Sequence, residues 1–257
     1  MNIPLQSLGQ LAAVLLGLVL CLIVSKQNRR TYFAFLFILV YVIAHVANRL
    51  PQFFNVYSVL DLGLSYNWIG HLLMILVVLL FLWYGPLSAK DIGLTLDQRS
   101  DTVVSAVIAT LGVIIFKGSI AVSVNGGPTY DGPPFDSVAA EELLFQTIMA
   151  PVAQELLYTG VLLSLLIVAL GEQKEDQTFS WNHVIVLAIA LTAFSHGIRF
   201  GLIYDGGFQF TVESFLFPFI GKLVYAWLRL STGSLLFPVI AFSLSNLATW
   251  ALPYLLS

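Results

Sequence analysis

The chain consists largely of long apolar runs that are separated by short polar segments. Most runs are about 20 residues long, the length that an α-helix needs to cross the ~30 Å hydrocarbon core of a bilayer. We therefore predict an all-α fold, a polytopic transmembrane helical bundle of seven or eight spans. The predicted helical segments are residues 5–24, 32–47, 68–84, 102–122, 137–170, 181–200, 208–229 and 234–255.

One segment, residues 137–170, is longer than a single span requires. As a straight helix it would extend about 51 Å, at ~1.5 Å per residue. Pro151 lacks an amide hydrogen and its ring crowds the preceding helical turn, so a proline here should interrupt the helix. We predict that Pro151 divides the segment into a short lead-in helix and a full span that starts near Ala153. The distribution of Lys and Arg between the loops leaves the orientation of the C-terminal half open.

The composition supports a membrane location and narrows the function. Hydrophobic residues make up 58% of the chain and charged residues 10%, whereas about a quarter of a soluble domain is charged. We expect one integral membrane domain over residues 1–257, with the lipid bilayer as its surroundings. Eleven scattered Lys and Arg and a net charge of −3 exclude a nucleic-acid-binding surface. A single cysteine excludes an intramolecular disulfide, and we expect no metal and no cofactor.

Polar residues inside the predicted spans mark the candidate site. A carboxylate at membrane depth costs several kcal/mol unless it is paired or solvated, so Glu155 is a functional candidate. Counted from the loops at ~1.5 Å per residue, Glu155, His196 and Asn246 lie roughly 20–24 Å from the same side. Lys222 and Phe242 form a second layer about one helical turn away. Simple hydrogen bonding between helices remains an alternative explanation for the His and the Asn, and is a weaker one for the Glu.

Other polar residues of the spans are interpreted structurally. His45 and His71 lie on otherwise apolar segments and are expected to be packing residues. Glu141 and Glu142 stand at the mouth of the lead-in helix, where we expect them to be solvated. Lys117 lies near the end of its span, so its long side chain is expected to reach the interface.

Three stretches of the sequence resemble the motifs of a known family. The run APVAQELLYTGVL from Ala150 resembles the first motif of the CPBP family (CAAX proteases and bacteriocin-processing intramembrane peptidases), which reads Glu-Glu-x-x-x-Arg. Residues 193–197 are similar to its second motif, which ends in a catalytic histidine. Residues 230–246 are similar to the third, His-x-x-x-Asn, and residues 90–94 to a short upstream segment. The resemblance covers a core of residues 88–250.

A second placement of the first motif exists. Glu141 and Glu142, followed by Gln146 at the arginine position, also match its spacing. We prefer the later placement because its flanking residues and its predicted depth agree with the family pattern as well.

The resemblance implies a catalytic apparatus with substitutions. In the family, the first glutamate and the second-motif histidine activate water, and the third-motif His and Asn stabilise the oxyanion. The first glutamate and the third-motif histidine are replaced here by Gln154 and Phe242, and the arginine by Thr159. Glu155, His196 and Asn246 retain the family's residue types.

These substitutions lead to two hypotheses about function. The first is an intramembrane endopeptidase that cleaves hydrophobic or prenylated peptides without an obligatory metal. In this case Glu155 serves as the base, and Lys222 supplies positive charge, either as the partner of Glu155 or at the oxyanion. The alternative is a catalytically inactive relative that binds a peptide or a membrane protein, as an immunity or scaffold protein. The resemblance implies the cell membrane of a prokaryote in either case.

Overall fold

A computed structural model describes residues 28–54, 66–124, 137–171, 181–204, 208–210 and 212–256, so the predicted first span, residues 5–24, lies outside the described residues. Helices occupy the other predicted segments, except that residues 208–210, predicted as the start of a helix, form a short strand; the all-α prediction is confirmed. A short antiparallel hairpin, β1 (Leu202–Tyr204) and β2 (Phe208–Phe210), joins two of them. The separate helices are α2 (Asn28–Phe53), α3 (Trp68–Tyr84), α4 (Val103–Val124), α8 (His183–Gly201), α9 (Val212–Thr232) and α10 (Leu236–Leu256).

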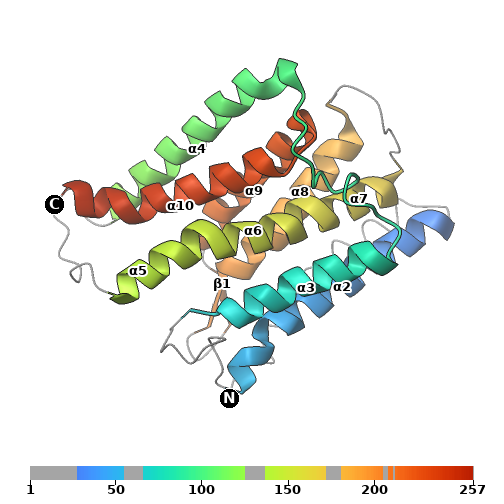
Figure 1. Cartoon of the computed structure of the whole chain (residues 1–257), viewed down its shortest axis with the longest axis horizontal. Coiled ribbons are helices and arrows are strands. Elements are labelled where there is room, and N and C mark those ends of the chain that lie inside the picture. Colours follow the sequence, from blue (N-terminus) through green and yellow to red (C-terminus); the bar gives the residue numbers. More distant parts are fainter. Residues whose placement is uncertain are drawn as a thin grey trace.

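A long continuous helix forms the centre of the bundle. It is built from α5 (Ser137–Leu144), η2 (Phe145–Met149), α6 (Ala150–Gln154), η3 (Glu155–Leu162) and α7 (Leu163–Leu170). In Figure 1 this helix crosses the middle of the molecule, with α2 and α3 on one side and α4 and α10 on the other. Helices α8 and α9 pack against each other and against η3. Side chains on η3 can therefore meet side chains from several other helices.

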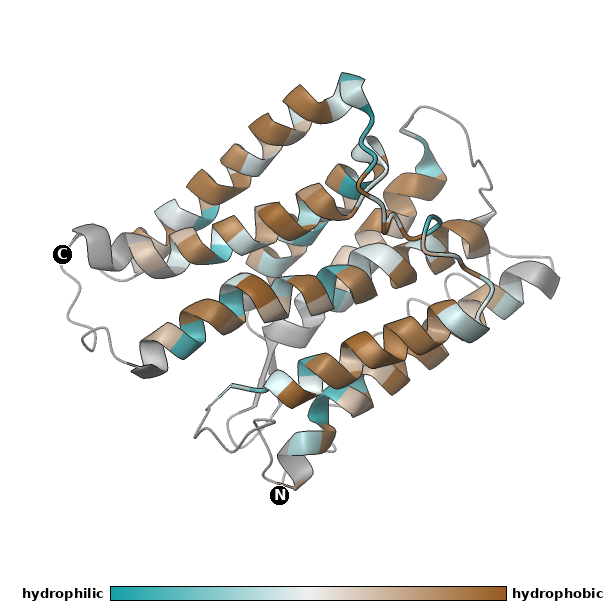
Figure 2. Ribbon diagram, viewed as in Figure 1, coloured by the Kyte–Doolittle hydropathy of each residue, from teal (hydrophilic) through white to brown (hydrophobic). Residues whose placement is uncertain are grey.

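The outer surfaces of the helices are apolar, as expected for a bundle in lipid. Figure 2 shows hydrophobic residues along most of the helices and polar residues mainly near their ends. Within the part of the chain that the structure describes, three helices are long and apolar enough to span a membrane, namely Thr31–Pro51, Ser100–Ser123 and Ala140–Leu170. In Ala140–Leu170, 83% of the most apolar part of the helix is buried, whereas in Ser100–Ser123 only 22% of that part is buried. The chain is an integral membrane protein in which α4 is peripheral and the long helix is central.

The predicted break at Pro151 is wrong, because the helix continues through this residue. A π-helical turn, η2, lies directly before it, and the amide of Ala150 donates to the carbonyl of Phe145, five residues back. The wider winding of a π-turn eases the crowding that the ring of Pro151 would cause in an α-helix. No separate lead-in helix forms, and α5 is the continuous beginning of the same rod.

A buried arginine connects the loop after α3 to the core. Arg229 of α9 donates from Nη2 to the carbonyl oxygen of Asp91 and, at 2.7 Å, to Ser164 Oγ on α7. The amide of Leu235 donates to Gly93 O at 2.8 Å. Gly93 has a φ of +75°, a conformation that side chains rarely adopt. These contacts fix the end of the bundle at which α9 turns into α10.

At the opposite end of the long helix, the prediction that Glu141 is solvated is wrong. Glu141 is buried rather than solvated, and its Oε1 accepts from the amide of Tyr66 at 2.9 Å and from Trp68 Nε1 at 3.0 Å. Asn67 caps α3 by accepting from the amide of Gly70 at 3.1 Å. A buried carboxylate requires donors of this kind, so Glu141 serves to fix the start of α3.

Candidate active site

Glu155 and Thr159 of the predicted first motif lie on the second π-helical segment of the long helix, and Gln154 directly precedes it at the end of α6. This segment, η3, begins at Glu155, and all of its residues are buried. Short π-segments inside α-helices often occur at functional sites because they shift side chains out of the α-helical register. The winding therefore changes at the buried carboxylate itself.

Glu155 forms an ion pair with Lys222, as the sequence predicted. Lys222 Nζ lies 2.5 Å from Glu155 Oε1, and both side chains are fully buried. The other carboxylate oxygen, Oε2, has no hydrogen-bond partner among the described residues. The ammonium also lies over the rings of Tyr158 and Phe242, at 5.2 and 5.5 Å from their centroids. Opposite charge and aromatic faces together offset the desolvation of the lysine.

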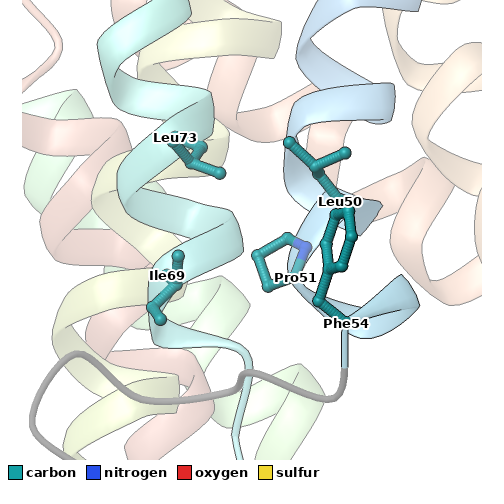
Figure 3. A pocket seen from close by; sticks show the side chains of 5 residues that line it. All are labelled: Leu50, Pro51, Phe54, Ile69 and Leu73. Carbon is teal, nitrogen blue, oxygen red and sulfur yellow. The ribbon is translucent and has the colours of Figure 1, made fainter.

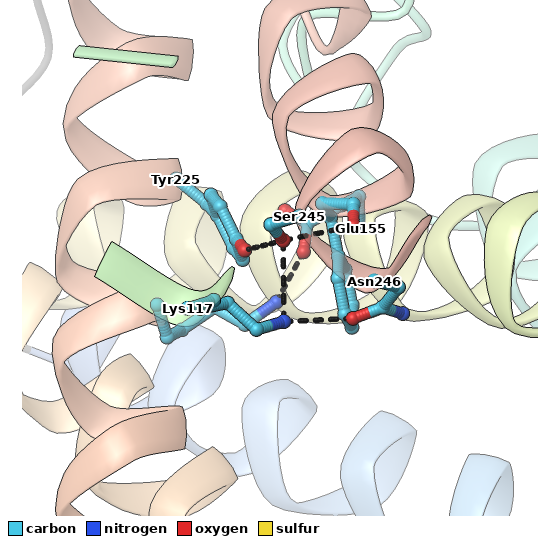
Figure 4. A network of polar contacts seen from close by, with 7 residues as sticks. Lys117, Glu155, Tyr225, Ser245 and Asn246 are labelled. Carbon is cyan, nitrogen blue, oxygen red and sulfur yellow. Dashed lines mark hydrogen bonds and ion pairs between the residues drawn. The ribbon is translucent and has the colours of Figure 1, made fainter. Parts of the chain in front are cut away.

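A second lysine, Lys117 of α4, reaches the same region. Its Nζ donates to Asn246 Oδ1 at 2.7 Å and to Ser245 Oγ at 3.1 Å. It also lies 5.2 Å from the centroid of the Phe242 ring. The prediction that Lys117 extends to the interface is wrong, because oxygen acceptors on α10 hold the ammonium inside the bundle (Figure 4).

Asn246 links α10 to the long helix. Its Nδ2 donates to the carbonyl oxygen of Gln146 at 2.8 Å, while its Oδ1 accepts from Lys117. Because an ammonium can only donate and a carbonyl can only accept, these two partners determine which way the amide points. Its neighbour Ser245 bonds to Tyr225 Oη at 2.9 Å (Figure 4). Four helical segments thus meet in one network.

His196, the histidine of the predicted second motif, lies on α8 and packs against the long helix that carries Glu155. His196 is buried, and its ring lies edge-on to Tyr158 with centroids 4.7 Å apart. Tyr158 Oη lies 2.9 Å from His45 Nε2, and His45 Nδ1 lies 2.8 Å from the carbonyl oxygen of Tyr41. In a neutral imidazole, Nδ1 then donates to the carbonyl and Nε2 accepts from the tyrosine. His45 is therefore more than the packing residue predicted from the sequence, because it positions Tyr158.

The three substituted positions differ in their surroundings. Gln154 and Thr159 are buried, and Gln154 Oε1 and Thr159 Oγ1 have no hydrogen-bond partner among the described residues. Phe242 stacks on Tyr225, with centroids 5.2 Å apart and ring planes at 21°. The phenyl ring of Phe242, at the predicted position of the third-motif histidine, thus contacts the ammonium groups of Lys117 and Lys222.

A metal centre and an apolar groove would be other kinds of functional site. Among the described residues, no group of three His, Cys, Asp or Glu side chains lies close enough together to hold a metal ion. Between α2 and α3 there is an open groove of about 240 Å³ lined by apolar residues (Figure 3). It carries no polar group that could take part in a reaction, so the network around Glu155 is the better candidate. The residues that line the groove are Leu50, Pro51, Phe54, Ile69 and Leu73.

Comparison with known proteins gives one match, to a family model. A family model described as type II CAAX prenyl endopeptidase Rce1-like matches residues 137–248. The match agrees with the resemblance of the motifs in this region to those of the CPBP family. The matched region contains all three motifs and Lys222, whereas Lys117 and His45 lie before it. Neither the curated proteins nor the solved structures that were searched gave a match.

The sequence reasoning missed several residues of the network. Ser245 and Tyr225 carry no motif signal, and Tyr158 is one of the variable positions of the first motif. A signal was available for Lys117, since it is the only charged residue between positions 102 and 122. Intramembrane charges usually face the interior of a bundle.

Proposed function

We propose that the protein is an intramembrane endopeptidase that cleaves hydrophobic or prenylated peptides in a prokaryotic cell membrane. The observation that supports this most directly is the state of Glu155. One oxygen of this buried carboxylate is paired with Lys222, and the other has no hydrogen-bond partner among the described residues. A carboxylate held in one orientation, with a lone pair available, suits a general base.

In the proposed reaction, Glu155 Oε2 takes a proton from a water molecule as the water oxygen attacks the carbonyl carbon of the substrate. A carbon–oxygen bond forms, and the π electrons of the carbonyl move onto its oxygen. When this oxyanion reforms the carbonyl, the carbon–nitrogen bond breaks. The proton held by Glu155 then passes to the leaving nitrogen, so that water is added across the amide and the enzyme is unchanged.

Lys222 and His196 have supporting roles in this proposal. Lys222 occupies the role of the missing arginine, because its ammonium contacts Glu155 and so orients the carboxylate. His196 contacts Tyr158, a residue that follows Glu155 by three positions on the long helix. In this proposal, His196 orients the attacking water. Loss of a positioned base or its partner typically lowers the rate about 10²- to 10⁴-fold.

The test is cleavage of hydrophobic and farnesylated peptides by purified protein in detergent. We expect Glu155→Gln and His196→Ala to lower kcat by about 10²- to 10⁴-fold. Glu141→Gln is the matched control, because Glu141 is also buried on the long helix but bonds to Tyr66 and Trp68 instead. Cleavage that survives Glu155→Gln unchanged would reject Glu155 as the base.

One observation favours a second candidate, a catalytically inactive relative that binds peptides or membrane proteins. Gln154 cannot accept a proton as a base, and Phe242 offers no donor to an oxyanion. The double variant Gln154→Glu/Phe242→His distinguishes the two candidates. Cleavage by this variant and not by the wild type would support the second candidate, a catalytically inactive relative.

A further inference from the structure

The buried network contains more positive than negative charge. Two ammonium groups, Lys117 and Lys222, share the surroundings of one carboxylate, Glu155, and both act electrostatically on each other. Of the described residues, only Lys222 forms an ion pair with it. The polar partners of Lys117 among the described residues are the neutral Ser245 and Asn246. A charge inside a membrane protein that is not held in an ion pair indicates function rather than packing.

The hydrogen bonds of this corner leave donors unused. An ammonium has three N–H donors, and Lys117 uses two of them on Asn246 Oδ1 and Ser245 Oγ. The amide nitrogen of Asn246 has two donors and uses one on Gln146 O. The described residues thus leave one donor on Lys117 and one on Asn246, two groups that are hydrogen-bonded to each other, and the Lys117 ammonium also lies over the Phe242 ring.

We propose that Lys117 and Asn246 form a binding site for a single anionic oxygen, and that Lys117 replaces the oxyanion-stabilising histidine whose position Phe242 occupies. This proposal rests on the proposed peptidase function for the identity of the oxygen, which is the former carbonyl oxygen of the substrate. Lys117 Nζ lies 5.2 Å from the centroid of the Phe242 ring. The ammonium on α4 therefore lies next to position 242 of α10, where the phenyl side chain has no donor.

The chemistry of the step requires such a charge. When water adds to the carbonyl carbon, the electron pair of the C=O bond moves entirely onto the oxygen. The ammonium of Lys117 and the amide of Asn246 stabilise that negative oxygen without transferring a proton. Donors of this kind act mainly in the transition state, because the neutral carbonyl of the substrate attracts them less.

The kinetic test separates this role from a structural one. We expect Lys117→Met to lower kcat on a cleavable peptide by about 10²- to 10³-fold and to leave KM nearly unchanged. Lys117→Met/Phe242→His should recover part of the loss, since it returns a donor to the third-motif position. Lys90→Met, which removes an exposed lysine outside the network, is the control. Full activity in Lys117→Met, or a loss explained by a lower melting temperature, would overturn the proposal.

A binding test keeps the inference independent of turnover. Protein in nanodiscs of zwitterionic lipid is titrated with decylphosphonate, and with decanol as the uncharged probe. We expect Lys117→Met to weaken phosphonate binding by roughly 10- to 100-fold, the effect of losing a hydrogen bond to a charged group, and to leave decanol binding unchanged. If the wild type cleaves no peptide but shows this difference, the peptidase proposal fails and the anion site stands. Equal phosphonate binding by both proteins would reject the anion site.

Discussion

Lys222 and Lys117 contact the same phenyl ring, that of Phe242, but they are held in different ways. Lys222, on α9, is fully buried and ion-paired with Glu155. Lys117, on the peripheral helix α4, is half-buried and bonds to the neutral oxygens of Ser245 and Asn246. Their distances to the ring centroid are nearly equal, at 5.5 and 5.2 Å.

The difference separates a charge that is needed for structure from one that is available for function. The charge of Lys222 compensates a carboxylate that would otherwise be buried alone, so removal of either partner leaves an uncompensated ion. Among the described residues, no charged group forms an ion pair with Lys117, and its neutral partners have other bonds. We therefore expect the loss of Lys222 to lower stability much more than the loss of Lys117, which should act mainly on the rate of cleavage.

The largest expected effect is that of Lys222→Met. It should lower the free energy of unfolding by about 3–5 kcal/mol, because it leaves the carboxylate of Glu155 buried without a counter-charge. The measurement is unfolding in detergent, followed by circular dichroism. The double variant Lys222→Met/Glu155→Leu removes both charges and should regain most of the loss. If the double variant were as unstable as Lys222→Met, the ion pair would not be the cause.

Phe242→Leu tests whether the two lysines share the ring. The variant keeps an apolar side chain but removes the aromatic face beneath two ammonium groups and the stacking on Tyr225. We expect a loss of about 2 kcal/mol in unfolding free energy from these combined interactions. Phe237→Leu is the matched control, since it makes the same change on the same helix and is only partly buried. Equal losses in both variants would show that the ring contributes only apolar area.

The smallest expected effect is that of Lys117→Met on stability. Because no buried charge loses its partner, the unfolding free energy should change by no more than about 1 kcal/mol, the range of an ordinary hydrogen bond. The same unfolding experiment gives this value beside that of Lys222→Met. A loss as large as that of Lys222→Met would contradict the distinction between the two lysines.

Much of the fold follows from the sequence because membrane helices have simple requirements. Every backbone polar group must be satisfied within the bilayer, so long apolar runs become helices. The predicted segments 68–84 and 102–122 agree with α3 and α4 to within two residues. The continuity of the helix at Pro151 could not be predicted in this way. It depends on the π-helical winding of η2, directly before the proline, and not on the length of the apolar run.

The site was predicted in part. Counting residues along helices gives depth, and depth brought Glu155 and Lys222 to neighbouring layers, in agreement with their ion pair. Depth does not give the direction in which a side chain points or the neighbours of a helix. The contact of Lys117 with Asn246 depends on the packing of α4 against α10, and the contact of His45 with Tyr158 depends on α2. The roles of all these residues in catalysis remain predictions.

The positions of Lys117 and His45 have a consequence for modularity. Both residues precede residue 137, where the match to the Rce1-like domain begins, and yet both bond to residues inside it. A fragment of residues 137–248, or a chimera that transplants only this region into another membrane protein, would lack the ammonium on Asn246 and the imidazole on Tyr158. The smallest transferable unit of this site is therefore larger than the matched region, and it begins no later than α2.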